Sequence, residues 1–259
     1  MPSELSTPSA NPFKFALQSQ RRQIGLWSGL GSNMVAEILA HAGFDWIVLD
    51  TEHAPNEVPS LLTQLQAMTG GSAEPVVRCA WNDPVLIKRI LDVGVRSLLV
   101  PWVQNADEAR RAVAASRYPP AGIRGIAVAT RATRWGRQMD YHHRSNHEMC
   151  IIVQIETGAA LREIEAIAAV DGVDGIFIGP SDLAADLGHL SNPGHSDVQT
   201  AIKDAATRVR AAGKSAGILT ADPAAAQRYL DMGFTFVAVG SDSGVLMQGA
   251  SKLAQTFKT

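Results

Sequence analysis

The feature that most constrains the fold is a regular alternation of short apolar runs with segments of helical periodicity. Eight runs have the length and composition of strands, at residues 24–27, 46–50, 75–79, 97–100, 150–156, 175–179, 215–219 and 236–240. Apolar residues recur at helical spacing in segments between them, including 32–42, 83–93, 106–116, 158–169 and 223–232. Strands joined through helices form parallel βαβ units, so the sequence predicts an α/β fold.

The number of these units decides between two architectures. A chain of 259 residues is long enough for two small domains or for one (β/α)8 barrel. A doubly wound open sheet is the rival, but no GxGxxG pattern follows the first strand run. We therefore predict one (β/α)8 TIM barrel over residues 23–259, preceded by an N-terminal tail and a short helix at 1–22.

Composition excludes several classes of partner. The formal net charge of −2 gives no general attraction to nucleic acid or to an anionic membrane. No apolar run approaches the ~18 residues that span a bilayer, and the polar first residues lack the pattern of a secretory signal. Cys79 and Cys150 are too few for a disulfide framework. We expect a cytoplasmic protein that acts on small molecules, with no nucleic-acid or membrane partner.

Reactive side chains gather where the predicted strands end. They are Asp50, Glu52 and His53 after the second strand, Arg78 in the third, Gln154 and Glu156 in the fifth, and Asp182 after the sixth. The beginnings of the strands carry mostly small and apolar residues. Because barrel enzymes build their chemistry at the C-terminal ends of the strands, this asymmetry predicts an active site there.

Two of these acids are candidate metal ligands. Gln154 and Glu156 share one face of a strand, and a carboxylate that faces a barrel interior must be neutralised, hydrogen-bonded or bound to a cation. Each acid alone has a simpler role, Glu156 as the partner of an arginine and Asp182 at the positive end of a helix dipole. Together they offer the oxygen ligands that Mg²⁺ or Mn²⁺ prefers.

His53 and Arg78 are candidate catalytic residues. A pair between Asp50 and the His53 imidazole would fix the histidine tautomer and hold a base that titrates near neutral pH. Arg78 is permanently charged and could stabilise a developing oxyanion. Its alternative role is an ion pair with Glu52 or Glu156.

Residues 110–144 carry eight arginines against one acid, Asp140, in a stretch that includes a long irregular segment. We weigh two interpretations of this cationic stretch. It is a solvated or oligomer-facing surface, or it attracts an anionic substrate towards the barrel mouth.

The strand-end segments resemble those of the HpcH/HpaI aldolase family. The resemblance runs from about residue 25 to the C-terminus, and its motifs are WIVLDTEHAP (46–55), VRCAWNDP (77–84), LVPWVQNA (99–106), YPPAGIRG (118–125), VQIET (153–157) and GIFIGPSD (175–182). It implies a metal-dependent, class II pyruvate aldolase on a barrel of the phosphoenolpyruvate/pyruvate-binding type. It also implies a hexamer, a trimer of dimers, in which neighbouring subunits exchange the last helix.

The resemblance also implies roles for individual residues. Glu156 and Asp182 would bind a divalent ion, Mg²⁺ or Mn²⁺ or also Co²⁺, with no organic cofactor. Arg78 would contact the keto oxygen of the substrate, and His53 paired with Asp50 would serve acid–base chemistry. The remaining substrate-binding positions are Gln154 beside the metal, the backbone amides of Ser181 and Asp182 at the pyruvate carboxylate, and Leu219.

The implied reaction is reversible aldol cleavage of a 4-hydroxy-2-oxo acid, such as 4-hydroxy-2-oxoheptanedioate, in the catabolism of aromatic compounds. Cleavage of a 2-keto-3-deoxy sugar acid of the rhamnonate or glucarate type, or decarboxylation of oxaloacetate, would use the same pyruvate enolate. A non-catalytic 2-oxo-acid binding protein is the alternative from another class. Residues 125–135 are one residue shorter than in related sequences, and Ser181 replaces their frequent alanine, so the preferred aldehyde stays open.

Overall fold

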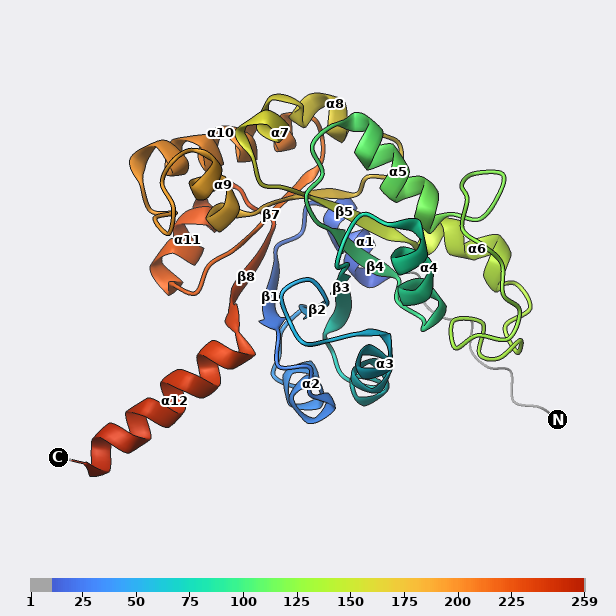
Figure 1. Cartoon of the computed structure of the whole chain (residues 1–259), viewed down its shortest axis with the longest axis horizontal. Helices are drawn as coiled ribbons and strands as arrows, with labels where there is room; N and C mark the ends of the chain where they lie inside the picture. Colours follow the sequence, from blue (N-terminus) through green and yellow to red (C-terminus); the bar gives the residue numbers. More distant parts are fainter. Residues whose placement is uncertain (1–10, 259) are drawn as a thin grey trace.

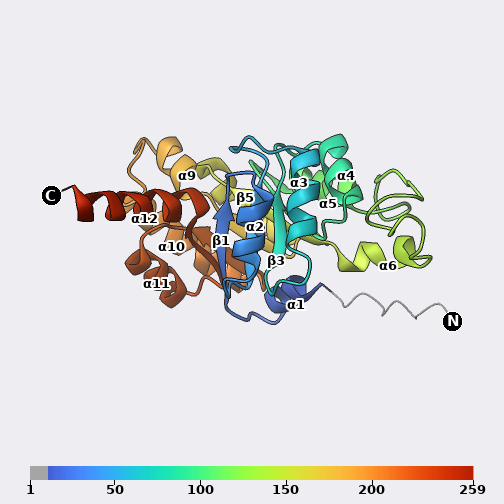
Figure 2. The same ribbon diagram turned by 90° about the horizontal axis from the view of Figure 1, so that it is seen from below.

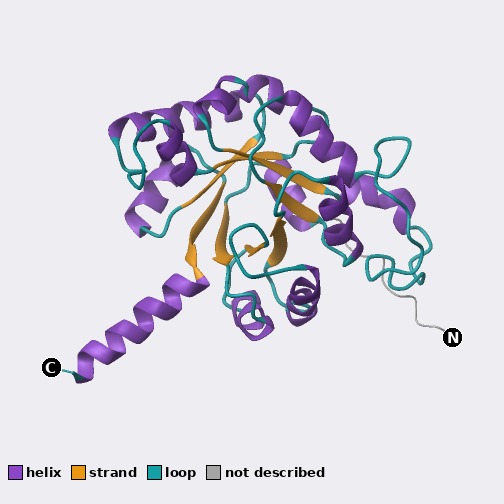
Figure 3. Cartoon of the chain, in the orientation of Figure 1, coloured by secondary structure: helices purple, strands orange, loops and turns teal. Residues whose placement is uncertain are grey.

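The computed structural model describes residues 11–258, and within this part eight parallel strands close into a barrel. Each strand pairs with the next in chain order, and β8 returns to β1. The strands are β1 (Gln23–Ser28), β2 (Trp46–Asp50), β3 (Glu74–Arg78), β4 (Ser97–Val100), β5 (Cys150–Ile155), β6 (Gly175–Ile178), β7 (Ser215–Leu219) and β8 (Phe236–Ser241). The predicted (β/α)8 fold is confirmed, and Figure 3 shows helices surrounding the strands.

The helices follow the order expected of βα units, with additional short helices in several connections (Figure 1). They are α1 (Pro12–Gln18), α2 (Asn33–Ala40), α3 (Val58–Ala67), α4 (Pro84–Asp92), α5 (Ala106–Ser116), α6 (Tyr141–Glu148), α7 (Gly158–Arg162), α8 (Ile164–Ala168), α9 (Pro180–Asp186), α10 (Ser196–Ala211), α11 (Pro223–Met232) and α12 (Asp242–Phe257). The helix predicted at 158–169 is divided in two, because Glu163 ends α7 and begins α8. No helix among the described residues is long and apolar enough to cross a membrane.

Aromatic side chains fill the N-terminal end of the barrel. Phe13 of α1 packs on Trp46 and Phe236, the first residues of β2 and β8, with ring centroids 5.5 and 6.0 Å apart. A Cβ atom at Gly217 would lie 2.1 Å from the Phe236 ring, so glycine there makes room for the large side chain. The short helix predicted within residues 1–22 is therefore α1, which closes this end of the barrel; residues 1–10 lie outside the described part.

Several arginines of the cationic stretch at 110–144 lie away from the barrel mouth. Arg131, Arg134 and Arg144 line a hollow of about 340 Å³ beside Glu74, where β3 begins. Arg124 is fully buried, with its guanidinium 4.5 Å from the Tyr118 ring centroid and 3.0 Å from Asp92. These positions do not fit attraction of substrate towards the mouth, because the arginines that line the hollow stand at the N-terminal end of the strands.

The last helix leaves the barrel instead of covering it. Figures 1 and 2 show α12 extending outward from the end of β8. Asp242 at its start is buried and accepts hydrogen bonds from the Ser28 hydroxyl and the Gly29 and Leu30 amides, which hold the helix start against β1. The apolar side chains farther along α12, including Val245, are exposed.

Candidate active site

A cavity of about 910 Å³ opens at the C-terminal ends of the strands. Six of the predicted site residues line it: His53, Arg78, Gln154, Ser181, Asp182 and Leu219. Asp50 and Glu156, the other two, contact lining residues directly. The structure thus brings together side chains contributed by or directly following β2, β3, β5, β6 and β7.

Arg78 is held by two carboxylates and an aromatic ring. Its Nε donates to Asp50 Oδ1 at 2.8 Å and one terminal nitrogen donates to Asp50 Oδ2 at 2.5 Å, while the other lies 2.7 Å from Glu52 Oε2. The guanidinium also lies 4.8 Å from the centroid of the Trp27 ring. Asp50 and Arg78 are register partners on adjacent parallel strands, which places their side chains next to each other. Arg78 is therefore fixed in orientation as well as in charge.

The two carboxyls around Arg78 respond differently to burial. Burial raises the pKa of Asp50, but two hydrogen bonds and the charge of Arg78 outweigh it, so the pKa lies below its ordinary value. At Glu52, burial outweighs the attraction of Arg78, and the pKa lies above its ordinary value. Asp50 is thus the permanent counter-ion, while Glu52 holds a proton more readily.

The expected pair between Asp50 and the His53 imidazole is absent from the described structure. The oxygens of Asp50 are occupied by Arg78, by the Trp27 indole at 3.1 Å, and by the backbone amides of Glu52 and His53 at 2.9 and 3.4 Å. The His53 Nε2 atom lies 4.0 Å from Glu52 instead, and its side chain is 69% exposed. His53 therefore lies at the cavity surface beside the Glu52 carboxyl group, and not beside that of Asp50 as expected.

Glu156 is buried immediately after β5 and is held by two neutral donors. Its Oε1 accepts from Gln154 Nε2 at 2.5 Å, and its Oε2 accepts from the Trp102 amide at 3.0 Å. Trp102 has a φ of +55°, which is strained for a non-glycine residue, and in this conformation its amide donates to Glu156. Within residues 11–258 no basic side chain forms an ion pair with Glu156, so the alternative role as an arginine partner is wrong.

This environment fits a divalent cation. Burial, together with the charges of Asp182 and Glu52, raises the pKa of Glu156 to about 7 against the two hydrogen bonds. The Gln154 Oε1 atom is also buried and has no hydrogen-bond partner among the described residues. Carboxylate and amide oxygens around uncompensated negative charge are the ligands of hard cations. Glu156 and Asp182 could hold such an ion, with Gln154 as a third oxygen.

Three contributors to the site were not identified from the sequence. Trp27 ends the first predicted strand run, one residue before the end of β1, and its indole contacts both Asp50 and Arg78; its place near a strand end was a usable signal. Gly179 makes room for the Glu156 carboxylate, since a Cβ there would lie 2.6 Å from Oε1. The Trp102 contribution is a backbone amide, and no side-chain pattern could have revealed it.

The chain is similar to known proteins along most of its length. The family model described as "HpcH/HpaI aldolase/citrate lyase" matches residues 23–249. A protein of Klebsiella pneumoniae subsp. pneumoniae named "4-hydroxy-2-oxo-heptane-1,7-dioate aldolase" is 58% identical over 248 residues, which cover 95% of this chain and 94% of the relative. A protein of the same name from Salmonella dublin is 57% identical, with the same coverage of both chains.

Solved structures agree with the architecture. An HpcH/HpaI aldolase/citrate lyase family protein from Burkholderia cenocepacia superposes with a TM-score of 0.94 at 39% identity, over 96% of this chain and 100% of that one. An HpcH/HpaI aldolase from Desulfitobacterium hafniense superposes with a TM-score of 0.87 at 27% identity, over 95% and 96% of the two chains.

Proposed function

Because the chain belongs to the HpcH/HpaI aldolase/citrate lyase family, we propose that it catalyses the reversible aldol cleavage of 4-hydroxy-2-oxoheptanedioate to pyruvate and 4-oxobutanoate. The name shared by relatives that are 57–58% identical supports this substrate. The structural observation that carries the proposal is the cavity lined by Arg78, Gln154 and Asp182, against which Gln154 holds the Glu156 carboxylate, a group with no cationic partner among the described residues.

Glu156 and Asp182, with Gln154 beside them, are the residues proposed to hold the divalent ion. When bound, such an ion acts as a Lewis acid for the 2-keto oxygen and its enolate. The all-oxygen ligand set favours Mg²⁺ or Mn²⁺, with Co²⁺ as a further candidate.

Arg78 supplies preorganised positive charge to the same oxygen. Its bonds to Asp50 and Glu52 and its contact with Trp27 hold the guanidinium in place before substrate binds. Little reorganisation is then needed as charge develops in the transition state, and this is where fixed donors contribute most. The amides of Ser181 and Asp182 lie in the first turn of α9 and are proposed to bind the pyruvate carboxylate.

His53 is proposed to move the proton of the C4 hydroxyl. Its Nε2 accepts this proton as the C3–C4 bond breaks and returns it in the direction of synthesis, directly or through water. The exposed position of the imidazole at the cavity surface supports exchange with solvent. Leu219 supplies an apolar part of the cavity wall.

The second carboxylate of the substrate needs a cationic group farther from the reacting atoms. Arg228 of α11 lines the cavity, and its nearest carboxylate among the described ion pairs, Asp222, lies 3.9 Å away. We assign the second carboxylate to Arg228. The variant Arg228→Gln should raise KM for 4-oxobutanoate in the synthetic direction and leave KM for propanal, a neutral aldehyde, nearly unchanged.

The reaction class is tested by exchange of the pyruvate methyl protons into D₂O, followed by NMR. An aldolase exchanges them with a divalent ion present and stops when a chelator is added, whereas a non-catalytic 2-oxo-acid binding protein exchanges none. Product formation from pyruvate and a panel of aldehydes then separates 4-oxobutanoate from the aldehydes of 2-keto-3-deoxy sugar acids. Release of pyruvate from oxaloacetate measures the decarboxylase alternative.

We further propose that the chain forms a hexamer, arranged as a trimer of dimers, in which α12 packs on a neighbouring subunit. Five large apolar residues of this helix are 62–83% exposed: Val245, Leu246, Met247, Leu253 and Phe257. On the barrel itself, α2 exposes Met34 and Ile38 at 70% and 67%. Light scattering coupled to gel filtration measures the assembly, and charged substitutions of Leu246 and Leu253 together should dissociate it.

A further inference from the structure

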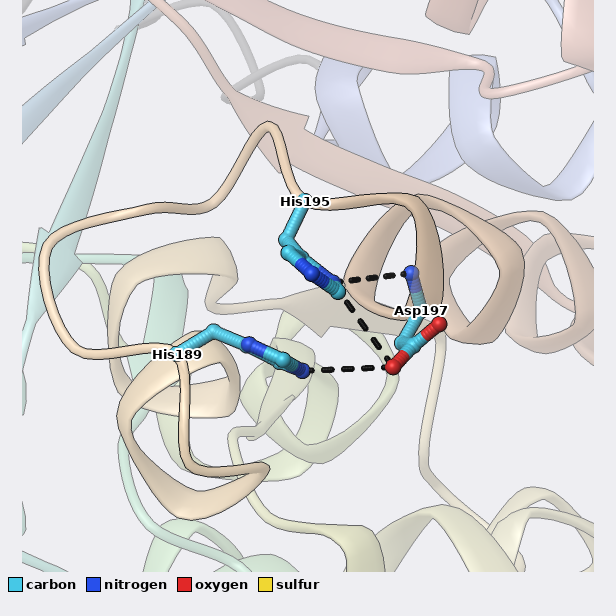
Figure 4. A group of neighbouring side chains, drawn as sticks. All are labelled: His189, His195 and Asp197. Atoms are coloured by element: carbon cyan, nitrogen blue, oxygen red, sulfur yellow. Dashed lines mark hydrogen bonds and ion pairs between the residues drawn. The ribbon is translucent and has the colours of Figure 1, made fainter.

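Three potential metal ligands converge beside the active-site cavity, on the connection between α9 and α10. His189 lies in the loop after α9, His195 caps the start of α10, and Asp197 is in its first turn. Figure 4 shows both imidazoles directed at one carboxylate. Asp197 Oδ2 lies 3.3 Å from His189 Nε2 and 3.7 Å from His195 Nδ1, and one potential ligand atom from each residue lies within 4.8 Å of the others.

We propose that this His–His–Asp cluster binds a transition-metal ion of the Zn²⁺ type. Zinc–ligand bonds of about 2.0–2.1 Å in a tetrahedron place neighbouring ligand atoms roughly 3.3 Å apart. The two observed histidine–carboxylate separations, 3.3 and 3.7 Å, are close to that spacing. Two imidazoles and one carboxylate leave a fourth position for water, as in three-ligand zinc sites.

The imidazole rings must open slightly to receive the ion. They are stacked, with centroids 3.5 Å apart and planes at 15°, so their nitrogen lone pairs lie in nearly parallel planes. The His189 and His195 side chains are 24% and 35% exposed, which leaves space for rotation about the Cβ–Cγ bonds. The Asp197 carboxylate offsets the positive end of the α10 dipole, which would otherwise disfavour a cation. Binding through Nδ1 also displaces the hydrogen bond that His195 accepts from the Asp197 amide at 3.3 Å, so it exchanges a stacked imidazole pair and one capping hydrogen bond for two metal–nitrogen bonds.

The ligand chemistry separates this cluster from the site at Glu156 and Asp182. Oxygen ligands favour Mg²⁺ and Mn²⁺, whereas imidazole nitrogens favour Zn²⁺, Ni²⁺ and Cu²⁺. A bound ion would tie the loop that contains His189 to the start of α10. Pro193 and Gly194 of the same loop line the active-site cavity, so the ion would stiffen part of the cavity wall.

Calorimetric titration with Zn²⁺ in excess Mg²⁺ tests the proposal on the full-length variant Glu156→Gln/Asp182→Asn, which lacks the carboxylate pair. One equivalent of Zn²⁺ should bind. Adding His189→Asn should weaken binding by at least the roughly 10–100-fold caused by loss of an outer-shell partner, and adding His195→Asn should do the same. Asparagine is a good N-cap, so the second substitution preserves the start of α10.

The matched control is His143→Asn/His147→Asn, which removes an exposed histidine pair at i, i+4 spacing on α6. It should leave the titration unchanged. Zn²⁺ should also slow amide hydrogen exchange over residues 188–196, and His189→Asn should abolish that protection. The proposal is overturned by absence of stoichiometric binding, by equal binding to the His189→Asn variant, or by loss of binding only in the α6 control. Proton exchange in pyruvate with Mg²⁺ and the wild-type chain reports on the aldolase proposal independently.

Discussion

The two ends of the same barrel solve opposite packing problems. At the N-terminal end, Phe13, Trp46 and Phe236 fill the interior with aromatic rings, and glycines beside them supply the space. At the C-terminal end, the interior contains Arg78, Asp50 and Glu156, all at most 7% exposed. The N-terminal end is stabilised by packing of aromatic side chains and the C-terminal end by pairing of buried charges. The strands between the two ends are only four to six residues long.

The difference shows where this fold can accommodate buried charge. A buried charge is destabilising unless it is paired or hydrogen-bonded, and the polar end satisfies this requirement for Arg78 and Asp50 but not fully for Glu156. The residual negative charge at Glu156 is the part that a cation would neutralise. The side chains of Phe13, Trp46 and Phe236 carry no charge, so substitutions there should change stability and leave the chemistry intact.

The largest effect is expected for Arg78→Ala. It should lower kcat by roughly 10²–10³, because preorganised charge at the enolate oxygen is lost. It should also lower the free energy of unfolding by about 3–5 kcal/mol, because Asp50 is left buried without its partner. Steady-state kinetics and denaturant unfolding measure the two effects. Wild-type kcat in a folded Arg78→Ala variant would remove Arg78 from the mechanism.

Phe13→Ala tests the aromatic packing at the N-terminal end of the barrel. Loss of a fully buried ring should lower the free energy of unfolding by about 3–5 kcal/mol, with kcat nearly unchanged at temperatures where the variant stays folded. The matched control is Phe15→Ala on the same helix, where the ring is 59% exposed and the expected change is about 0.5 kcal/mol. A large fall in kcat for the Phe13 variant would show that the two ends are coupled.

Gly179→Ala is a smaller change, confined to the polar end. The new Cβ would lie 2.6 Å from Glu156 Oε1, and relief of such overpacking costs about 1–3 kcal/mol. Mg²⁺ affinity, measured by calorimetry, should therefore fall by about tenfold or more as the carboxylate is displaced. Gly249→Ala on α12 is the control, because a Cβ atom at that position would have nothing within 4 Å, and it should bind Mg²⁺ like the wild type.

The smallest effect concerns an ion pair outside the barrel. Arg208 lies 2.5 Å from Glu165 and its hydrogen bonds lower the pKa of Glu165 to about 2, but the glutamate side chain is 60% exposed. Glu165→Gln should therefore cost under about 1 kcal/mol at pH 7, as exposed pairs do. Because the folded-state pKa is lowered, this contribution is present above the ordinary value of 4.5 and is lost as the pH falls towards 2. The difference in thermal unfolding between the two proteins should shrink over that interval; a difference as large at pH 2 as at pH 7 would contradict the assignment.

Much of the fold was accessible from the sequence because its periodicities are local. The strand at 46–50 and the helix at 106–116 occur at the predicted residues. Other features depend on distant contacts. The closure of the barrel by Phe13 depends on its contacts with Trp46 and Phe236, which belong to elements far apart in the chain.

The site divides in the same way. Residues at strand ends were predicted as its members, because a parallel barrel brings those ends to one face. Their pairing was not accessible in the same way. His53 lies three residues from Asp50, yet the backbone turn gives Asp50 the amides of Glu52 and His53, and strand register gives it Arg78 from 28 residues away. Sequence proximity did not determine which acid faces the imidazole.

The sequence by itself determined the order of strands and helices, the set of reactive side chains and the family, because these depend on local periodicity and on residue identity. The tertiary structure alone decided which groups touch. It placed Arg78 between two acids, left Glu156 with two neutral donors and an unbalanced charge, and brought His189 and His195 to one carboxylate. Those contacts depend on strand register, side-chain burial and loop conformation. These are properties of the folded chain that local periodicity does not specify.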